Sequence, residues 1–163
     1  MNYLWLDAET TGLNPVHNDI IEMAAIPFLK GKEQPTFHEF CQPVNWQNWS
    51  EEAERVHGIS KEKAKTFQSS ADALDKMITT LESYNCKWTI AGYNVDYDKK
   101  MMSGWFAKHG RSEDFNRLFE VPTHCTHRRW KKVLKELGSK APQTENNKLE
   151  TLAKHFNIEI DAH

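Results

Sequence analysis

The feature that most constrains this chain is its first short segment, where an apolar run ends in two acidic residues. Residues 3–6 are aromatic or aliphatic and lead into a Thr-Thr-Gly turn, which predicts a buried strand. Asp7 and Glu9 lie two positions apart, so on a strand both side chains point to one face. Carboxylates this close repel each other unless a cation lies between them, and oxygen ligands suit Mg²⁺ or Mn²⁺. The segment favours a metal site; two solvated acids at a strand end are the alternative.

The composition is that of an ordinary globular domain. The chain has 163 residues, 27% charged and 39% hydrophobic, which predicts one compact domain over residues 1–163. A net charge of −2 neither indicates nor excludes nucleic acid as a partner. Cys41, Cys86 and Cys125 form no Cys-x-x-Cys pair, which favours free thiols and a cytoplasmic location. No signal peptide or membrane-spanning run is recognisable, so we expect no membrane association.

The hydrophobic pattern predicts a mixed sheet. Strands are expected over residues 20–29 and 36–42, joined by a polar turn at 30–32, so that the first three strands form an antiparallel meander. Later strands are expected over 88–94 and 124–126. Each of these follows a helical segment, which implies crossover connections and parallel pairing.

Helical patterns alternate with these strands. Ser50 is the expected N-cap of a first helix, and apolar residues recur at helical spacing over 71–81, 96–109, 130–137 and 149–156. Gly138 is expected to end the third of these four segments. The order β-β-β-α-β-α-β-α predicts an α/β fold with a five-stranded mixed sheet flanked by helices. By analogy of element order, this is the ribonuclease H-like arrangement.

A third acid stands at a predicted strand-to-helix junction. Asp96 is the expected N-cap of the helix over 96–109, which places Asp98 in its first turn, where the helix dipole favours a carboxylate. Such junctions are where α/β folds assemble their sites. Simple helix capping is the alternative for Asp98 taken alone.

Four segments, in this order, resemble the DEDDh (DnaQ-like) family of 3′-5′ exonucleases, and the resemblance covers essentially the whole chain. That family includes bacterial proofreading subunits, RNase T and oligoribonuclease. The segments are Asp7-x-Glu9-Thr10-x-Gly12-Leu13, Val56-His57-Gly58-Ile59, Asn94-x-x-Tyr97-Asp98, and Leu149-x-x-Leu152-Ala153 running into Ala162-His163.

The resemblance implies a role for each matched residue. It assigns Asp7, Glu9 and Asp98 to two divalent metal ions, Mg²⁺ or Mn²⁺, and His163 to the general base. It also implies a pocket for the 3′-terminal nucleotide, formed by Thr10, Leu13, His57, Asn94 and Tyr97.

The chain departs from the family pattern in two ways. Tyr93 stands where the family often has histidine. The family's final metal-binding aspartate lies beyond its histidine, whereas the sequence stops at His163, so we expect the 1–163 exonuclease domain to lack the last helix.

The activity implied by the resemblance is removal of nucleotides from the 3′ end of single-stranded DNA or RNA, releasing 5′-monophosphates. Three alternatives stay open: an oligoribonuclease, which Thr10 disfavours; a polymerase-bound proofreading subunit; and a non-catalytic module that binds 3′ ends. The expected partners are a single-stranded 3′ end and either a second copy or a polymerase. The sequence does not choose DNA over RNA, because sensing the 2′-hydroxyl depends on pocket geometry.

Two further features have more than one interpretation. The helix expected after Thr126 is the most basic segment of the chain. Its basic side chains either contact the phosphates of a nucleic-acid strand or are simply exposed to solvent. Trp46 and Trp49 either form a binding surface or cover the core under a long connection. The basic residues are Arg128, Arg129, Lys131, Lys132 and Lys135.

Overall fold

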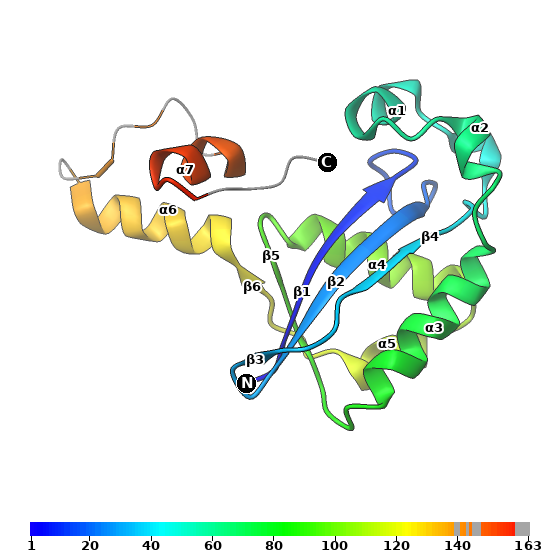
Figure 1. The fold of residues 1–163 in the computed structure, drawn as a ribbon, viewed down its shortest axis with the longest axis horizontal. Helices are drawn as coiled ribbons and strands as arrows, with labels where there is room; N and C mark the ends of the chain where they lie inside the picture. Colours follow the sequence, from blue (N-terminus) through cyan, green and yellow to red (C-terminus); the bar gives the residue numbers. More distant parts are fainter. Residues whose placement is uncertain (139–140, 143, 145–147, 159–163) are drawn as a thin grey trace.

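The computed structural model describes residues 1–138, 141–142, 144 and 148–158. One mixed sheet forms its centre, with strands in the order β3-β2-β1-β5-β6 and with β4 also paired to β2 (Figure 1). The pairs β1·β2, β2·β3 and β2·β4 are antiparallel, and β1·β5 and β5·β6 are parallel. The strands are β1 Tyr3–Thr10, β2 Ile20–Leu29, β3 Lys32–Glu33, β4 Phe37–Phe40, β5 Thr89–Gly92 and β6 His124–Cys125.

The mixed α/β class is confirmed, but the predicted number of five strands is wrong, because the sheet has six strands within the described residues. The additional strand is β3, which forms where only a turn was expected. Lys30 and Gly31 both adopt positive φ (51° and 80°), so the turn is tight and pairing resumes at once between Leu29 and Lys32. Pro35, which has no backbone donor, separates β3 from β4.

Helices cover the sheet. The predicted cap of the first helix is confirmed, since the Ser50 hydroxyl accepts a hydrogen bond from the Ala53 N–H. Helix α5 was not predicted, because its seven residues carry only two buried side chains and show no clear period. The helices are α1 Glu51–His57, α2 Lys61–Ala64, α3 Ser70–Glu82, α4 Asp96–Lys108, α5 Ser112–Leu118, α6 Thr126–Leu137 and α7 Leu149–His155, with a 3₁₀ turn η1 at Trp46–Asn48.

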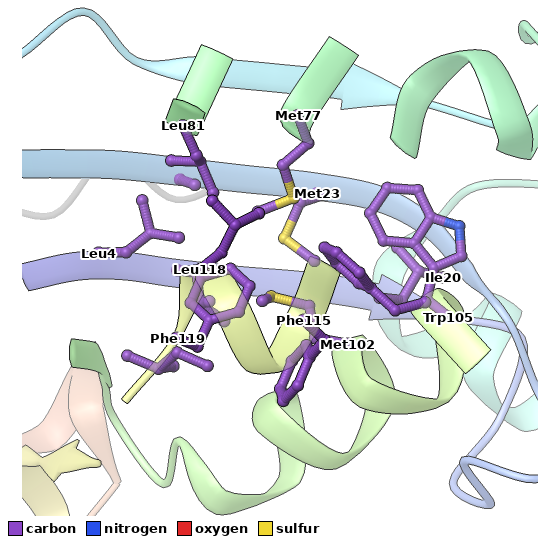
Figure 2. Close-up of a cluster of buried hydrophobic side chains, with 14 of the residues drawn as sticks. Leu4, Ile20, Met23, Met77, Leu81, Met102, Trp105, Phe115, Leu118 and Phe119 are labelled. Carbon is purple, nitrogen blue, oxygen red and sulfur yellow. The ribbon is translucent and has the colours of Figure 1, made fainter. Parts of the chain in front are cut away.

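The core lies between one face of the sheet and helices α3, α4 and α5 (Figure 2). Leu4 and Ile20 from the strands are fully buried against Met77 and Met102 from the helices. Trp105 is 2% exposed, and its indole N–H donates to the Ser70 hydroxyl at 2.7 Å. This buried layer holds β1 and the start of α4 in fixed relation.

Helices α6 and α7 lie beside the sheet rather than in this core (Figure 1). No residue of α6 is fully buried, and the ring of Trp130 packs edge-on against Phe156, next to α7, at 5.5 Å between ring centres. Gly138 ends α6, as predicted, with a φ of 53°. No helix in the described ranges is both long and apolar enough to span a bilayer.

Candidate active site

Strand β1 carries the first two acids on one face of the sheet. Leu6 is buried in the core, whereas its neighbour Asp7 is exposed, which is the alternation expected along a strand. In the antiparallel register, Asp7 lies opposite Ala24 and Glu9 lies opposite Glu22. The prediction that both carboxylates share a face therefore agrees with the register of β1 and β2.

Asp98 joins these two acids from the first turn of α4. It is buried, with 6% of its surface exposed. Burial raises the pKa of Asp98 to about 7, and the charges of Asp7 and Glu9 add to the rise. Burial also raises the pKa of Glu9, with further contributions from Asp7 and Glu22. The three acids named by the sequence are thus close enough to repel one another.

This donor set fits a hard divalent cation. Its ligands are carboxylate oxygens, and burial together with the charges of Asp7 and Glu9 raises the pKa of Asp98, a rise that a bound cation would oppose. Within the described ranges, however, no three histidine, cysteine or acidic side chains already form a group able to hold a metal ion. Asp7, Glu9 and Asp98 would hold such an ion.

The start of α4 differs from the prediction. Asp96 is not an N-cap: the helix begins at Asp96, and the preceding residue, Val95, makes no capping bond. The Asp96 carboxylate instead accepts a hydrogen bond from Thr123 at 3.0 Å and lies 3.0 Å from the guanidinium of Arg128. Asp98 nevertheless stands in the first turn, where it was predicted.

A pocket of about 210 Å³ lies beside Glu9, between β1, α1 and α4. Four of the five predicted nucleotide-binding residues line it. The fifth, Asn94, is exposed and adopts a left-handed φ of 58° in the turn before α4. The lining residues are Ala8, Glu9, Thr10, Gly12, Leu13, Ser50, Glu52, Ala53, Val56, His57 and Tyr97.

Hydroxyl groups fix one wall of this pocket. The hydroxyls of Thr10 and Tyr97 lie 2.9 Å apart, and both reach the Gly12 carbonyl, at 2.9 and 3.1 Å. This network holds the Tyr97 ring against the turn that follows β1. Leu13, on the same turn, is 83% exposed, so it is a rim residue and not a core residue.

His57 supplies a hydrogen-bond donor at the opposite wall. Its Nδ1 accepts from the Ile59 N–H at 3.0 Å, so a neutral ring carries its proton on Nε2. The Nε2 atom is buried and makes no well-formed hydrogen bond with the described residues, although the Thr10 backbone is close enough to oppose the fall in pKa. Burial lowers the pKa of His57, which favours the neutral ring. A polar ligand in the pocket would satisfy this donor.

Trp46 and Trp49 support that wall from behind. Their rings stack with centres 6.1 Å apart, and Trp49 meets His57 edge-on at 6.3 Å. The Trp49 indole N–H donates to Glu54 of α1 at 2.7 Å. Both tryptophans are half-buried and neither lines the pocket, which supports the packing interpretation over the binding surface.

An anchor for the turn after β1 was missed by the sequence analysis. Asp19 is buried, 2.6 Å from the Lys108 ammonium of α4, and accepts from the Asn45 N–H at 2.7 Å. Its backbone carbonyl accepts from the Thr11 N–H, and its own N–H donates to the Thr11 hydroxyl. Asp19 thereby ties the pocket's turn to α4, and only the tertiary contact with Lys108 reveals this.

Glu22 was also missed. It faces Glu9 across the strand pair and lies 2.7 Å from His38. Its sequence position inside an apolar run gave no sign of this, because the register between β1 and β2 decides the pairing. His163 lies outside the described residues, so its role stays a prediction.

The comparison with known families decides the classification. A family model described as an exonuclease, of the RNase T type, matches residues 4–163. The chain belongs to the DnaQ-like exonuclease family. The resemblance stated from the motifs is therefore confirmed, and with it a nuclease domain.

Relatives of this exonuclease chain include PolC-type DNA polymerase III proteins. The one from Lacticaseibacillus paracasei is 25% identical over 99% of the chain, and the one from Lactococcus lactis is 32% identical over 66% of it. The chain spans only 10% and 6% of the length of these two relatives.

Solved exonucleases share its fold. E. coli exonuclease I in complex with a dT13 oligonucleotide has a TM-score of 0.78 at 17% identity, over 97% of this chain and 36% of that one. Cell-death related nuclease 4 has a TM-score of 0.70 at 12% identity, over 97% of this chain and 55% of that one. These likenesses confirm the ribonuclease H-like fold.

Proposed function

We propose that this DnaQ-like exonuclease removes nucleotides one at a time from the 3′ end of single-stranded nucleic acid, releasing 5′-monophosphates. The observation that carries the proposal is the electrostatic coupling of Asp98 to Asp7 and Glu9, since Glu9 also lines the pocket that Thr10 and Tyr97 help to form. A divalent cation bound between the acids of β1 and α4 would relieve their mutual repulsion.

Asp7, Glu9 and Asp98 are proposed to hold two divalent ions, Mg²⁺ or Mn²⁺. Bound there, the ions supply neutralisation of phosphate charge, an activated water and stabilisation of the leaving 3′ oxygen. His163 is proposed to take the proton of the attacking water, a role suited to the ordinary pKa range of histidine.

The pocket beside Glu9 is proposed to receive the terminal nucleotide. Leu13 and Tyr97 offer apolar contact to a base, which does not depend on which base is present. The Nε2–H of His57, which the Thr10 backbone approaches without a well-formed hydrogen bond, is proposed to donate to an oxygen of the sugar or phosphate. Asn94, outside the pocket lining, is proposed to contact the nucleotide from the α4 side.

The substrate strand, the protein partner and the cellular setting also belong to the proposal. The oligonucleotide in the exonuclease I complex supports a single-stranded substrate, and the PolC-type relatives support association with a polymerase over a homodimer. An oligoribonuclease and a non-catalytic 3′-end-binding module remain the alternatives. Residues 1–163 are proposed to form one domain, and the three free cysteines support a reducing, cytoplasmic setting.

The test is hydrolysis of a 5′-labelled single strand in the presence of Mg²⁺. We expect a ladder of products shortened from the 3′ end, in the parent and in Asp96→Asn but not in Asp98→Asn. The two variants remove one acid each from the same helical turn, and only Asp98 faces the acid pair. Shortening from the 5′ end, or equal activity of all three proteins, would contradict the proposal. Binding without hydrolysis in every protein would favour the non-catalytic module.

A further inference from the structure

Helix α6 is divided lengthwise into an apolar and a cationic stripe. Trp130 and Leu134 lie on the apolar stripe, together with the partly exposed Val133 and Leu137. At helical spacing, the cations occupy the opposite side, and all of them are exposed. The cationic stripe comprises Arg128, Arg129, Lys131, Lys132 and Lys135.

The cationic stripe begins beside the first turn of α4, on the side of Asp96. Helix α6 follows β6, whose last residue, Cys125, pairs with Gly92 at the end of β5. Arg128 lies 3.0 Å from Asp96, in the same helical turn as Asp98. From there α6 projects away from the sheet (Figure 1). A strand leaving the acids on this side would meet the stripe first.

The charges on this stripe are largely uncompensated. Among the described residues, Lys131 and Lys135 make no ion pair, and Lys132 only approaches Glu136, at 3.9 Å with both side chains exposed. Lys108, by contrast, faces the buried Asp19 directly at 2.6 Å. The chain as a whole carries a net charge of −2, so this positive strip is local.

We propose that the cationic stripe of α6 binds phosphates of the substrate strand on the 5′ side of the terminal nucleotide. The inference rests on the proposed function, which places the 3′ end at the acids. From Arg128 to Lys135 the helix axis advances about 10 Å, a length on the scale of a few consecutive phosphates of one strand. Contacts to phosphates carry no base preference, which suits an enzyme that degrades any sequence.

A length-dependent affinity follows from this placement. A dinucleotide occupies the pocket and the acids but cannot extend along α6. A strand of about 12 nucleotides, within the range that single-strand binding surfaces cover, reaches the whole stripe. The stripe should therefore lower KM for long strands and leave dinucleotides unaffected.

The test compares two double variants that each remove two exposed lysine charges. Lys131→Gln/Lys135→Gln alters the stripe. Lys30→Gln/Lys32→Gln alters the β2–β3 turn, which contacts Asn2 at the opposite end of β1 from the acids. Fluorescence anisotropy with a labelled strand of about 12 nucleotides is measured over a series of salt concentrations, without divalent metal.

We expect the stripe variant to bind the strand roughly tenfold more weakly. The negative slope of the logarithm of the association constant against the logarithm of salt concentration should become shallower by about 1.4, the value for two lost phosphate contacts on a single strand. The turn variant should match the parent. Equal losses in both variants, or an unchanged slope in the stripe variant, would overturn the inference.

Hydrolysis separates this inference from the proposed function. The stripe variant should show a raised KM for the long strand, an unchanged kcat, and parent-like cleavage of a dinucleotide. Equal KM values for the long strand in stripe variant and parent would overturn the inference while leaving the exonuclease intact. If the parent cleaves neither substrate, the proposed function fails, and the salt slopes still decide whether α6 binds the strand.

Discussion

The two faces of the central sheet are used for different purposes. On the covered face, Leu4 and Met23 are almost completely buried under α3, α4 and α5. On the open face, Trp5 and Ile26 are each 36% exposed and stand next to the exposed Asp7. Because consecutive residues of β1 point to opposite faces, one strand both stabilises the fold and presents the acids. Substitutions one position apart should therefore separate stability from activity.

Leu6 and Asp7 are neighbours on β1 that point to the covered and the open face, respectively. We expect Asp7→Asn to lower kcat/KM on the order of a thousandfold with little change in the free energy of unfolding, because it removes a proposed metal ligand worth several kcal/mol. Leu6→Ala should instead cost about 2 to 5 kcal/mol of stability, since it empties a core position. Steady-state hydrolysis and urea unfolding measure the two quantities. The comparison breaks if Asp7→Asn unfolds the protein or retains full activity.

Two tryptophans extend the comparison from the sheet to the helices. Trp105 is buried on the covered side and bonded to Ser70, so Trp105→Ala should lower the free energy of unfolding by about 3 to 5 kcal/mol. Trp130 on α6 is only half-buried, so Trp130→Ala should cost about 1 kcal/mol. Chemical unfolding of both variants provides the check, and similar losses would show that α6 belongs to the same cooperative core.

The buried acid beside the open face makes stability depend on pH. The pKa of Asp98 rises from 3.8 to about 7 on folding, so the folded chain retains a proton that the unfolded chain releases. The resulting stabilisation is fully present below about pH 4 and is lost as pH rises through about 7. The total loss in the free energy of unfolding is at most about 4 kcal/mol.

In metal-free protein, Asp98→Asn should remove this dependence and raise the melting temperature at pH 8 by several degrees. Thermal melts of parent, Asp98→Asn and Asp96→Asn across this pH range test the sign. A parent that gains stability between pH 5 and pH 8, relative to Asp98→Asn, would contradict the assigned burial.

The smallest effect is expected from a single hydroxyl. Tyr97→Phe removes the hydrogen bonds to Thr10 and Gly12 that fix the pocket wall, worth about 1 kcal/mol, so KM should rise about fivefold while kcat changes little. Tyr84→Phe is the matched control, because Tyr84 packs on Trp88 and does not line the pocket. Equal KM values in the two variants would remove Tyr97 from the substrate site.

Local patterns in the sequence were sufficient to predict the three acids but not the residues that surround them. The two-residue period of a strand places Asp7 with Glu9, and the strand-to-helix junction places Asp98, because both depend on neighbouring residues only. Glu22 opposite Glu9 depends on the register of β1 against β2, which residues distant in sequence determine.

Contacts with distant segments also determine which bonds the side chains at the start of α4 make. Asp96 was expected to cap α4 through its own side chain, but Thr123 and Arg128 from the following segments bind its carboxylate instead. The predicted general base, His163, lies outside the described residues. The motif resemblance therefore supplied the family and the acids, and the structure supplied what surrounds them.

The most direct test of the central claim is calorimetric titration of Mn²⁺ into the protein at pH 7, comparing the parent with Asp98→Asn and with Asp96→Asn. Three converging acids predict divalent-ion binding by the parent, accompanied by proton release from Asp98, and at least about tenfold weaker binding by Asp98→Asn alone. Identical Mn²⁺ affinities and proton release in the parent and Asp98→Asn would contradict the claim that Asp98, Asp7 and Glu9 form one metal site.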